Sequence, residues 1–98
     1  MAWADAYIAE LQQNRAVSFR PRGNSMSGKI NSGDLVEVIP VTELKKGDIV
    51  LCRVNGAHYL HFISAVRKGQ FQISNNHGHI NGCTTKDKIY GIVKSVSK

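Results

Sequence analysis

Long apolar segments are absent from this sequence. Stretches such as Ile49 to Cys52 fall far short of the roughly 20 residues that a membrane-spanning helix requires. The N-terminus, Met1 to Asp5, also lacks the basic start and apolar run of a secretory signal. We therefore expect no membrane span, and a cytoplasmic location is the default expectation.

Cysteine is scarce as well, since the chain has only Cys52 and Cys83. A secreted fold of this size that depends on disulfides usually carries more cysteines. Two reduced cysteines in or near the core are the favoured interpretation. A single bridge between them stays open as the alternative.

Runs of like charge are also missing. The net charge is +6, which suits a nucleic-acid partner, but no basic run is longer than two residues. The chain has only seven aromatic residues, one Trp, three Tyr and three Phe, and most fall at positions typical of a core rather than of a base-stacking surface. We therefore do not favour a nucleic-acid partner.

Ninety-eight residues suffice for one domain. Residues 3–14 have helical periodicity, with Trp3, Tyr7, Ile8 and Leu11 on one side, so residues 1–16 are predicted to form a helix that packs on one end of a sheet. Core packing of Trp3 and Tyr7 is favoured over a partner-binding stripe. Short β-rich runs then follow at 17–20, 35–41, 48–54, 57–66, 71–74 and 89–96, and residues 75–87 are interpreted as a polar loop. The prediction is a mainly β domain, with a β core over residues 17–96 that forms a compact, coiled or barrel-like antiparallel sheet.

The dipeptide Asn55-Gly56 lies between two of these runs and predicts a two-residue hairpin turn. Such a turn fixes the register, so Val50 should lie opposite His61. Because side chains alternate along a strand, His61 should face the same side as apolar residues. Burial would favour its neutral form, which a general base requires. The simpler interpretation is a core histidine bonded to a backbone carbonyl.

Three sequence motifs favour a catalytic role for His61 over that of a core histidine. The segment Gly23-Asn24-Ser25-Met26 precedes two Gly-Asp-apolar-apolar strand starts, at 33–36 and 47–50. This order resembles the LexA-like and signal-peptidase-like serine peptidases, whose nucleophile lies in a Gly-x-Ser-Met motif. The closing run 88–93, Lys-Ile-Tyr-Gly-Ile-Val, resembles the final strand of that family. The resemblance covers residues 17–96 and implies a single peptidase-like domain over 1–98.

The resemblance also implies roles for particular residues. Ser25 would be the nucleophile, and His61 would be the base at a position where many members carry lysine and the eukaryotic and archaeal signal peptidases carry histidine. The backbone amides around Gly23 and Asn24 would hold the oxyanion, and Asn75 would orient the His61 ring. A peptide or protein substrate would bind as an extended strand, and no cofactor or metal is expected.

The sequence departs from the family in several respects. Ser74-Asn75-Asn76 stands where histidine-type signal peptidases have Gly-Asp-Asn, so an acidic residue is missing. No Ala-Gly or Cys-Gly bond precedes Ser25, so self-cleavage of the LexA type is not expected. These departures leave a catalytically silent module that binds a protein partner as the main alternative.

A metal site is a further alternative. His77, His79 and Cys83 lie close together in the sequence, and zinc accepts such ligands. A closed zinc site usually has paired Cys or His motifs at characteristic spacings, which this segment lacks. A polar turn is therefore favoured over a metal site.

Overall fold

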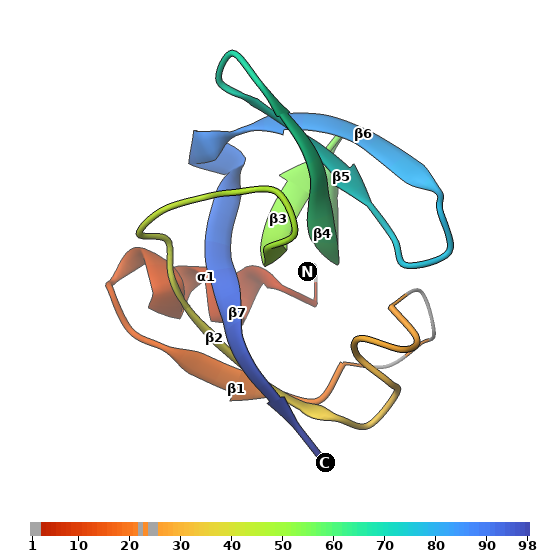
Figure 1. Ribbon diagram of the computed structural model, residues 1–98. Coiled ribbons are helices and arrows are strands. Elements are labelled where there is room, and N and C mark those ends of the chain that lie inside the picture. The colour runs from red at the N-terminus through yellow and green to blue at the C-terminus, as the bar shows by residue number, and fades with distance from the viewer. Residues whose placement is uncertain (1–2, 22, 24–25) are drawn as a thin grey trace.

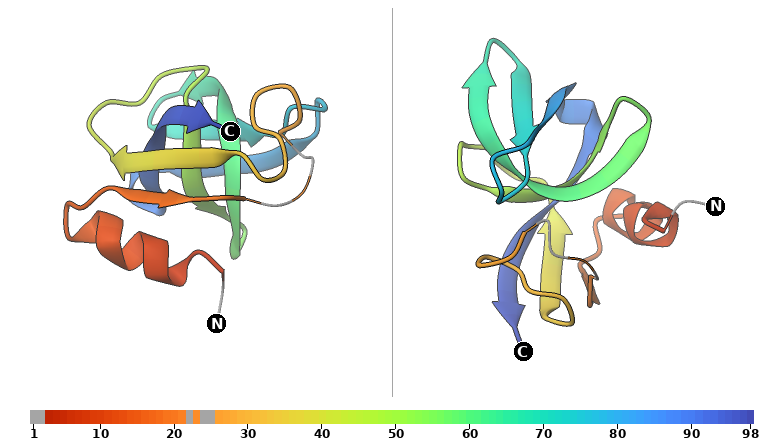
Figure 2. Two further views of the ribbon diagram at one scale, coloured as in Figure 1. Left: turned by 90° about the horizontal axis from the view of Figure 1, so that it is seen from below. Right: turned by 90° about the vertical axis from the view of Figure 1, so that its right-hand side faces the viewer.

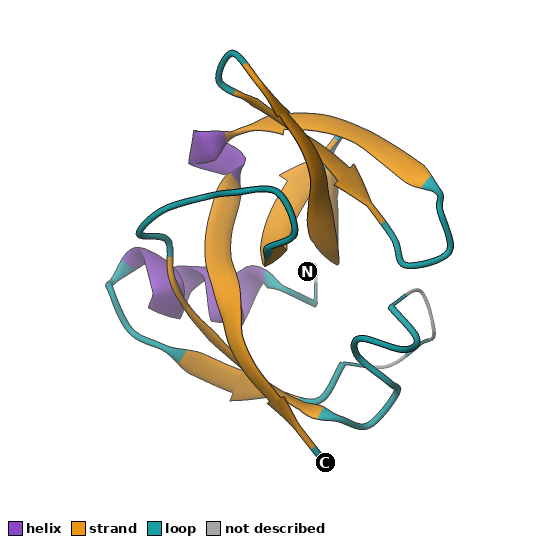
Figure 3. Cartoon of the chain, in the orientation of Figure 1, coloured by secondary structure: helices purple, strands orange, loops and turns teal. Residues whose placement is uncertain are grey.

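The computed structural model describes residues 3–21, 23 and 26–98 (Figure 1). Seven strands form one antiparallel sheet in the order β1-β2-β7-β3-β4-β5-β6. The mainly β prediction is confirmed, and Figure 3 shows how the strands curl around one another with the N-terminal α-helix beside them. The elements are α1 (Asp5–Gln12), β1 (Val17–Phe19), β2 (Leu35–Pro40), β3 (Ile49–Val54), β4 (Ala57–Arg67), β5 (Gln70–Ser74), β6 (Ile80–Thr85), a 3-10 turn (Lys86–Lys88) and β7 (Ile89–Ser97).

Strand β7 joins the two parts of the sheet. Its Gly91 and Ile92 pair with β3, while Gly91 to Ser97 pair with β2. Figure 2 shows the consequence: β1 and β2 lie toward one end of the molecule, and β3 to β6 curl around the other. The β1 and β6 strands are the two edges of this sheet.

The hairpin register predicted from Asn55-Gly56 is confirmed. Val54 pairs with Ala57, and Val50 pairs with His61. Asn55 and Gly56 both have positive φ, at 49° and 83°, as a two-residue hairpin turn requires. This turn therefore determines where His61 lies along β4.

The apolar side chains form two clusters separated by β3. Leu51 belongs to one cluster, with Val36, Val38, Leu60 and residues of α1. Its neighbours Val50, Cys52 and Val54 belong to the other, with Ile63, Phe71, Ile73 and Ile89. A strand that is buried on both faces has few polar positions, which explains the unbroken apolar run at Ile49 to Cys52.

The polar segment after β5 differs from the prediction. Residues 75–87 were expected to form a loop, but Ile80–Thr85 form the edge strand β6, which pairs with β5. Side chains of β6 are mostly exposed or half-buried, so an apolar alternation was never required there. A loop remains only before it, where the backbone N–H of Asn75 donates to the His79 carbonyl at 2.9 Å.

Helix α1 is shorter than the helix predicted over residues 1–16 and buries Ile8 and Leu11. Tyr7 stacks on Phe19 of β1, with ring centroids 4.3 Å apart. Trp3, by contrast, is 51% exposed, so its predicted place in the core is wrong. It touches the rings of Tyr7 and Phe19 and leaves one side open to solvent.

Both cysteines are free. Cys52 is buried, and burial raises the pKa of its thiol to about 12. Cys83 lies on the surface of β6. The bridge left open by the sequence is therefore absent, and only Cys52 occupies the core. No helix within the described residues is long and apolar enough to cross a membrane.

Close packing explains why residue 91 of β7 is a glycine. A Cβ at Gly91 would lie 2.5 Å from Val38 Cγ1 and 2.9 Å from Leu11 Cδ1, so no side chain fits between the sheet and α1. Gly91→Ala is expected to lower the free energy of unfolding by about 1–3 kcal/mol through overpacking. Denaturant unfolding measures this, with Ser95→Ala on the exposed end of β7 as the control. A change below about 0.5 kcal/mol in Gly91→Ala would show that the helix is not packed as described.

Candidate active site

His61 lies in the middle of β4 and is only 6% exposed. Its register opposite Val50 directs the ring to the same side of the strand as Tyr59, whose ring centroid is 4.9 Å away. Burial lowers the pKa of His61 below its ordinary 6.5, the hydrogen bond to Asn81 raises it, and nearby His79 lowers it. The net direction is downward, so the ring is neutral at neutral pH.

Asn81 holds the ring of His61 at one nitrogen. The His61 Nδ1 atom lies 2.7 Å from the Asn81 Oδ1 atom. An amide oxygen can only accept a hydrogen bond, so Nδ1 is the protonated nitrogen when Asn81 is placed this way. In the neutral ring, Nε2 then carries the lone pair. This is the tautomer that a general base needs.

The side chain that contacts His61 Nδ1 is thus that of Asn81, and the orienting role expected of Asn75 stays a prediction. The Asn75 Oδ1 atom accepts hydrogen bonds from the backbone N–H groups of His77 and His79, at 2.9 and 3.0 Å. Its oxygen is used within its own turn, a common role for Asn. Asn81 was missed because it lies on β6, which the sequence did not reveal as a strand.

Ser25 and Asn24, the predicted nucleophile and one oxyanion residue, lie outside the described residues. Gly23 and Met26, which flank them in the sequence, line the same pocket as His61. Gly23 has a φ of +107°, and its N–H donates to Ser32 Oγ at 3.4 Å, which is longer than a usual hydrogen bond. The oxyanion roles of Gly23 and Asn24 stay predictions.

A hydrogen bond ties the segment after Ser25 to the loop before β6. The Asn76 Nδ2 atom donates to the Ser27 carbonyl oxygen at 2.5 Å. A Cβ at Gly28 would lie 3.2 Å from the same nitrogen, so the two segments approach closely there. Met26, which is 4% exposed, anchors this segment in the apolar cluster beneath it.

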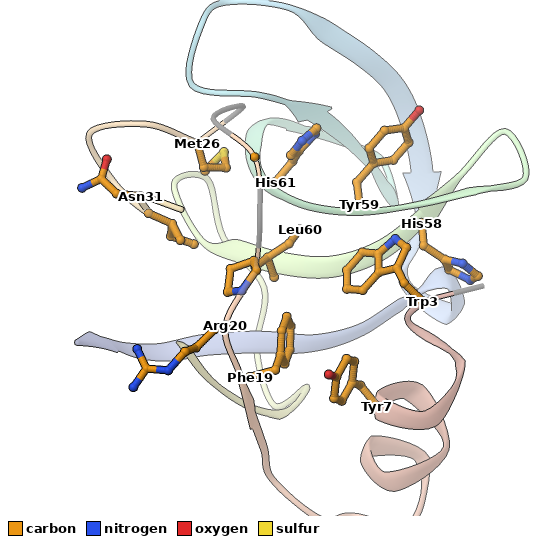
Figure 4. Close-up of a pocket in the computed structure, with 13 residues that line it drawn as sticks. Trp3, Tyr7, Phe19, Arg20, Met26, Asn31, His58, Tyr59, Leu60 and His61 are labelled. Carbon is orange, nitrogen blue, oxygen red and sulfur yellow. The ribbon is translucent and has the colours of Figure 1, made fainter. Parts of the chain in front are cut away.

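The pocket beside His61 has a volume of about 510 Å³. Figure 4 shows it along β4, with His61 and Tyr59 on one side of the strand and Leu60 on the other. It is lined by Trp3, Tyr7, Phe19, Arg20, Pro21, Gly23, Met26, Ile30, Asn31, His58, Tyr59, Leu60 and His61.

Part of the β4 edge along this pocket has no partner strand on its second side among the described residues. Pairing with β5 begins only at Phe62, which lies opposite Ser74. Residues 57–60 pair with β3 and with no other described strand. Backbone groups of an accessible edge can pair with an added strand. An extended peptide could therefore lie in the pocket against this edge.

The possible metal ligands do not gather. The described residues include no group of three or more His, Cys, Asp or Glu side chains that could hold a metal ion. His77 and His79 lie in the loop before β6, and Cys83 is exposed on that strand.

Comparison with known proteins identifies the family of the chain. The comparison with curated proteins gave no match. A family model described as Peptidase S24-like matches residues 2–93, nearly the whole chain. The resemblance that rested on the Gly-x-Ser-Met and Gly-Asp motifs is thereby confirmed, and the chain belongs to the Peptidase S24-like family.

Proposed function

We propose that the chain is a serine peptidase in which Ser25 is the nucleophile and His61 is the general base. The observation that carries this proposal is the state of His61, a buried and neutral imidazole whose Nδ1 atom is held by Asn81. A serine hydroxyl is a weak nucleophile until a base removes its proton. Gly23 and Met26, the first and last residues of the serine motif, line the same pocket as this base, which supports the pairing.

The proposed reaction is acyl transfer to serine followed by hydrolysis. Ser25 Oγ forms a bond to the peptide carbonyl carbon while its proton passes to His61 Nε2. The tetrahedral intermediate then breaks the C–N bond, and His61 returns the proton to the leaving amine. Water attacks the acyl ester by the same route, which releases the acid and restores Ser25. Backbone amides around Gly23 and Asn24 would stabilise the oxyanion.

The substrate would bind as an extended strand. The edge of β4 at 57–60 supports this, because no other described strand than β3 pairs with it and residues 58–60 line the pocket that contains His61. Main-chain hydrogen bonds would give affinity, and the pockets beside the strand would give specificity. A peptide aligned along β4 would carry its carbonyl groups past His61.

The competing function is a silent module that binds a protein partner. The observation that favours it is the neutral Asn81 amide at Nδ1. An amide orients the ring but cannot stabilise the imidazolium by charge, as a carboxylate does. An enzyme hydrolyses peptides and a silent module only binds them, so a hydrolysis assay separates the two functions.

The pH dependence of peptide hydrolysis tests the proposal. Because the pKa of His61 is lowered below 6.5, kcat/KM should rise as pH increases through that lowered value and be level at neutral pH. In Asn81→Asp, a carboxylate would stabilise the imidazolium and raise the pKa of His61, so the acid limb should move to higher pH. The profile is measured in wild type and in this variant. Absence of hydrolysis at every pH, or an acid limb that Asn81→Asp leaves in place, would contradict the proposal.

A further inference from the structure

One wall of the pocket is aromatic. Trp3 lies 6.0 Å from Phe19 and 6.5 Å from Tyr7 between ring centroids, and Tyr7 stacks on Phe19. Figure 4 shows these rings grouped on the Leu60 side of β4. We call Trp3, Tyr7 and Phe19 the aromatic wall. Through this wall, helix α1 contributes Tyr7 to the lining of the pocket that contains His61.

The exposure of the wall is uneven. Phe19 is only 8% exposed, whereas Trp3 is 51% exposed. A large apolar ring left in water is stabilised when an apolar partner covers it, and aromatic partners add favourable ring contacts. The wall therefore offers apolar area that an apolar side chain would cover, whereas an alanine side chain would leave most of it in water.

From these observations, and on the basis of the proposed peptidase function, we infer the substrate class. The structure assigns to the substrate a large aromatic or aliphatic side chain that packs on Trp3 in the aromatic wall. The pocket is continuous from this wall to His61, so one peptide would occupy both parts.

The distance along β4 limits where that side chain lies. His58, Tyr59, Leu60 and His61 all line the pocket, and a strand rises about 3.3 Å per residue. The span from His58 to His61 is thus about 10 Å, or three residue steps. A peptide paired with this edge would place its bulky residue within three residues of the scissile bond.

Trp3 supplies a direct readout because it is the only tryptophan in the chain. The test uses capped heptapeptides of alanine and glutamate in which a single Phe is moved from position to position. The reference is the same peptide with Ala in place of the Phe. Binding is followed by Trp3 fluorescence in Ser25→Ala, which cannot turn the peptides over, and hydrolysis is followed by mass spectrometry in wild type.

The expected result is a position at which Phe tightens binding about ten- to a hundredfold over Ala, from the area it buries. At that position wild type should also cleave faster, within three residues of the Phe. In Trp3→Ala, the preference in hydrolysis should fall by about tenfold, while Val66→Ala, which removes an exposed apolar side chain outside the pocket, should keep it. Thermal unfolding verifies that both variants fold.

The outcomes separate the two proposals. Hydrolysis with no preference for Phe over Ala at any position would overturn the inferred substrate class and leave the peptidase in place. Tighter binding of a Phe peptide in the Trp3 fluorescence assay without any cleavage would overturn the peptidase proposal. The peptide would then be a ligand and not a substrate, but the preference of the aromatic wall for a large apolar side chain would stand. Equal binding of all peptides would overturn the inference even if Trp3→Ala failed to fold.

Discussion

Ser25→Ala is expected to abolish peptide hydrolysis, with kcat/KM at least about a thousandfold lower than in wild type. Alanine has no hydroxyl, so no acyl-enzyme can form. Binding of the peptide in the neighbouring pocket cannot replace this covalent step. The measurement is the rate of peptide cleavage by protein whose folding has been verified by thermal unfolding.

The matched control is Ser18→Ala, which removes an exposed serine of β1. It should keep kcat/KM within about threefold of wild type, because this side chain is neither in the pocket nor in the proposed chemistry. If Ser25→Ala hydrolysed peptides as fast as this control, Ser25 would not be the nucleophile, and another group would have to be sought.

His61→Gln is expected to cause the second large loss of activity. Glutamine has about the size and hydrogen-bonding capacity needed to fill the site, but it cannot accept and return a proton near neutral pH. General acid–base catalysis typically contributes about 10² to 10⁴ in rate, so kcat should fall by about that factor. KM should change much less, because the β4 edge at 57–60 and the aromatic wall remain.

His77→Gln is the control for this substitution. His77 lies in the exposed loop before β6, outside the pocket, and its replacement should leave kcat near the wild-type value. A kcat in His61→Gln equal to that of His77→Gln would show that His61 is a structural histidine of the core, the simpler interpretation of its place on an apolar face.

The parts of the fold that sequence could predict are those determined by short-range rules. The Asn55-Gly56 turn fixed the register of β3 and β4, and so placed His61 opposite Val50. The β-rich run 48–54 predicted the strand that separates the two clusters, observed as Ile49–Val54. Both depend on neighbours in the chain, and both were correct.

The errors arose where structure depends on distant contacts. Strand β6 has mostly exposed or half-buried side chains and is held by backbone pairing with β5. Its own residues therefore gave no alternation of apolar and polar side chains that would predict a strand. Asn81 lies on that strand and was missed for the same reason. Trp3 has helical spacing with Tyr7, but tertiary packing left it exposed beside a pocket rather than in the core.

The candidate site shows the same division. His61 was predicted from the hairpin register together with a family motif, and its burial and contact with a polar side chain are observed. Its contact with Asn81 could not be inferred, because the resemblance pointed to Asn75, and only the structure shows that the Asn75 oxygen accepts hydrogen bonds within its own turn.

Covalent labelling of Ser25 by a fluorophosphonate is the most direct test of the claim that this serine and His61 work together. The probe reacts with a serine only when a base activates the hydroxyl, and peptide mapping identifies the modified residue. We predict a single adduct on Ser25 in wild type, formed at least about a hundredfold more slowly in His61→Gln. An adduct on another residue, no adduct in wild type, or equal labelling rates in wild type and His61→Gln would contradict the account.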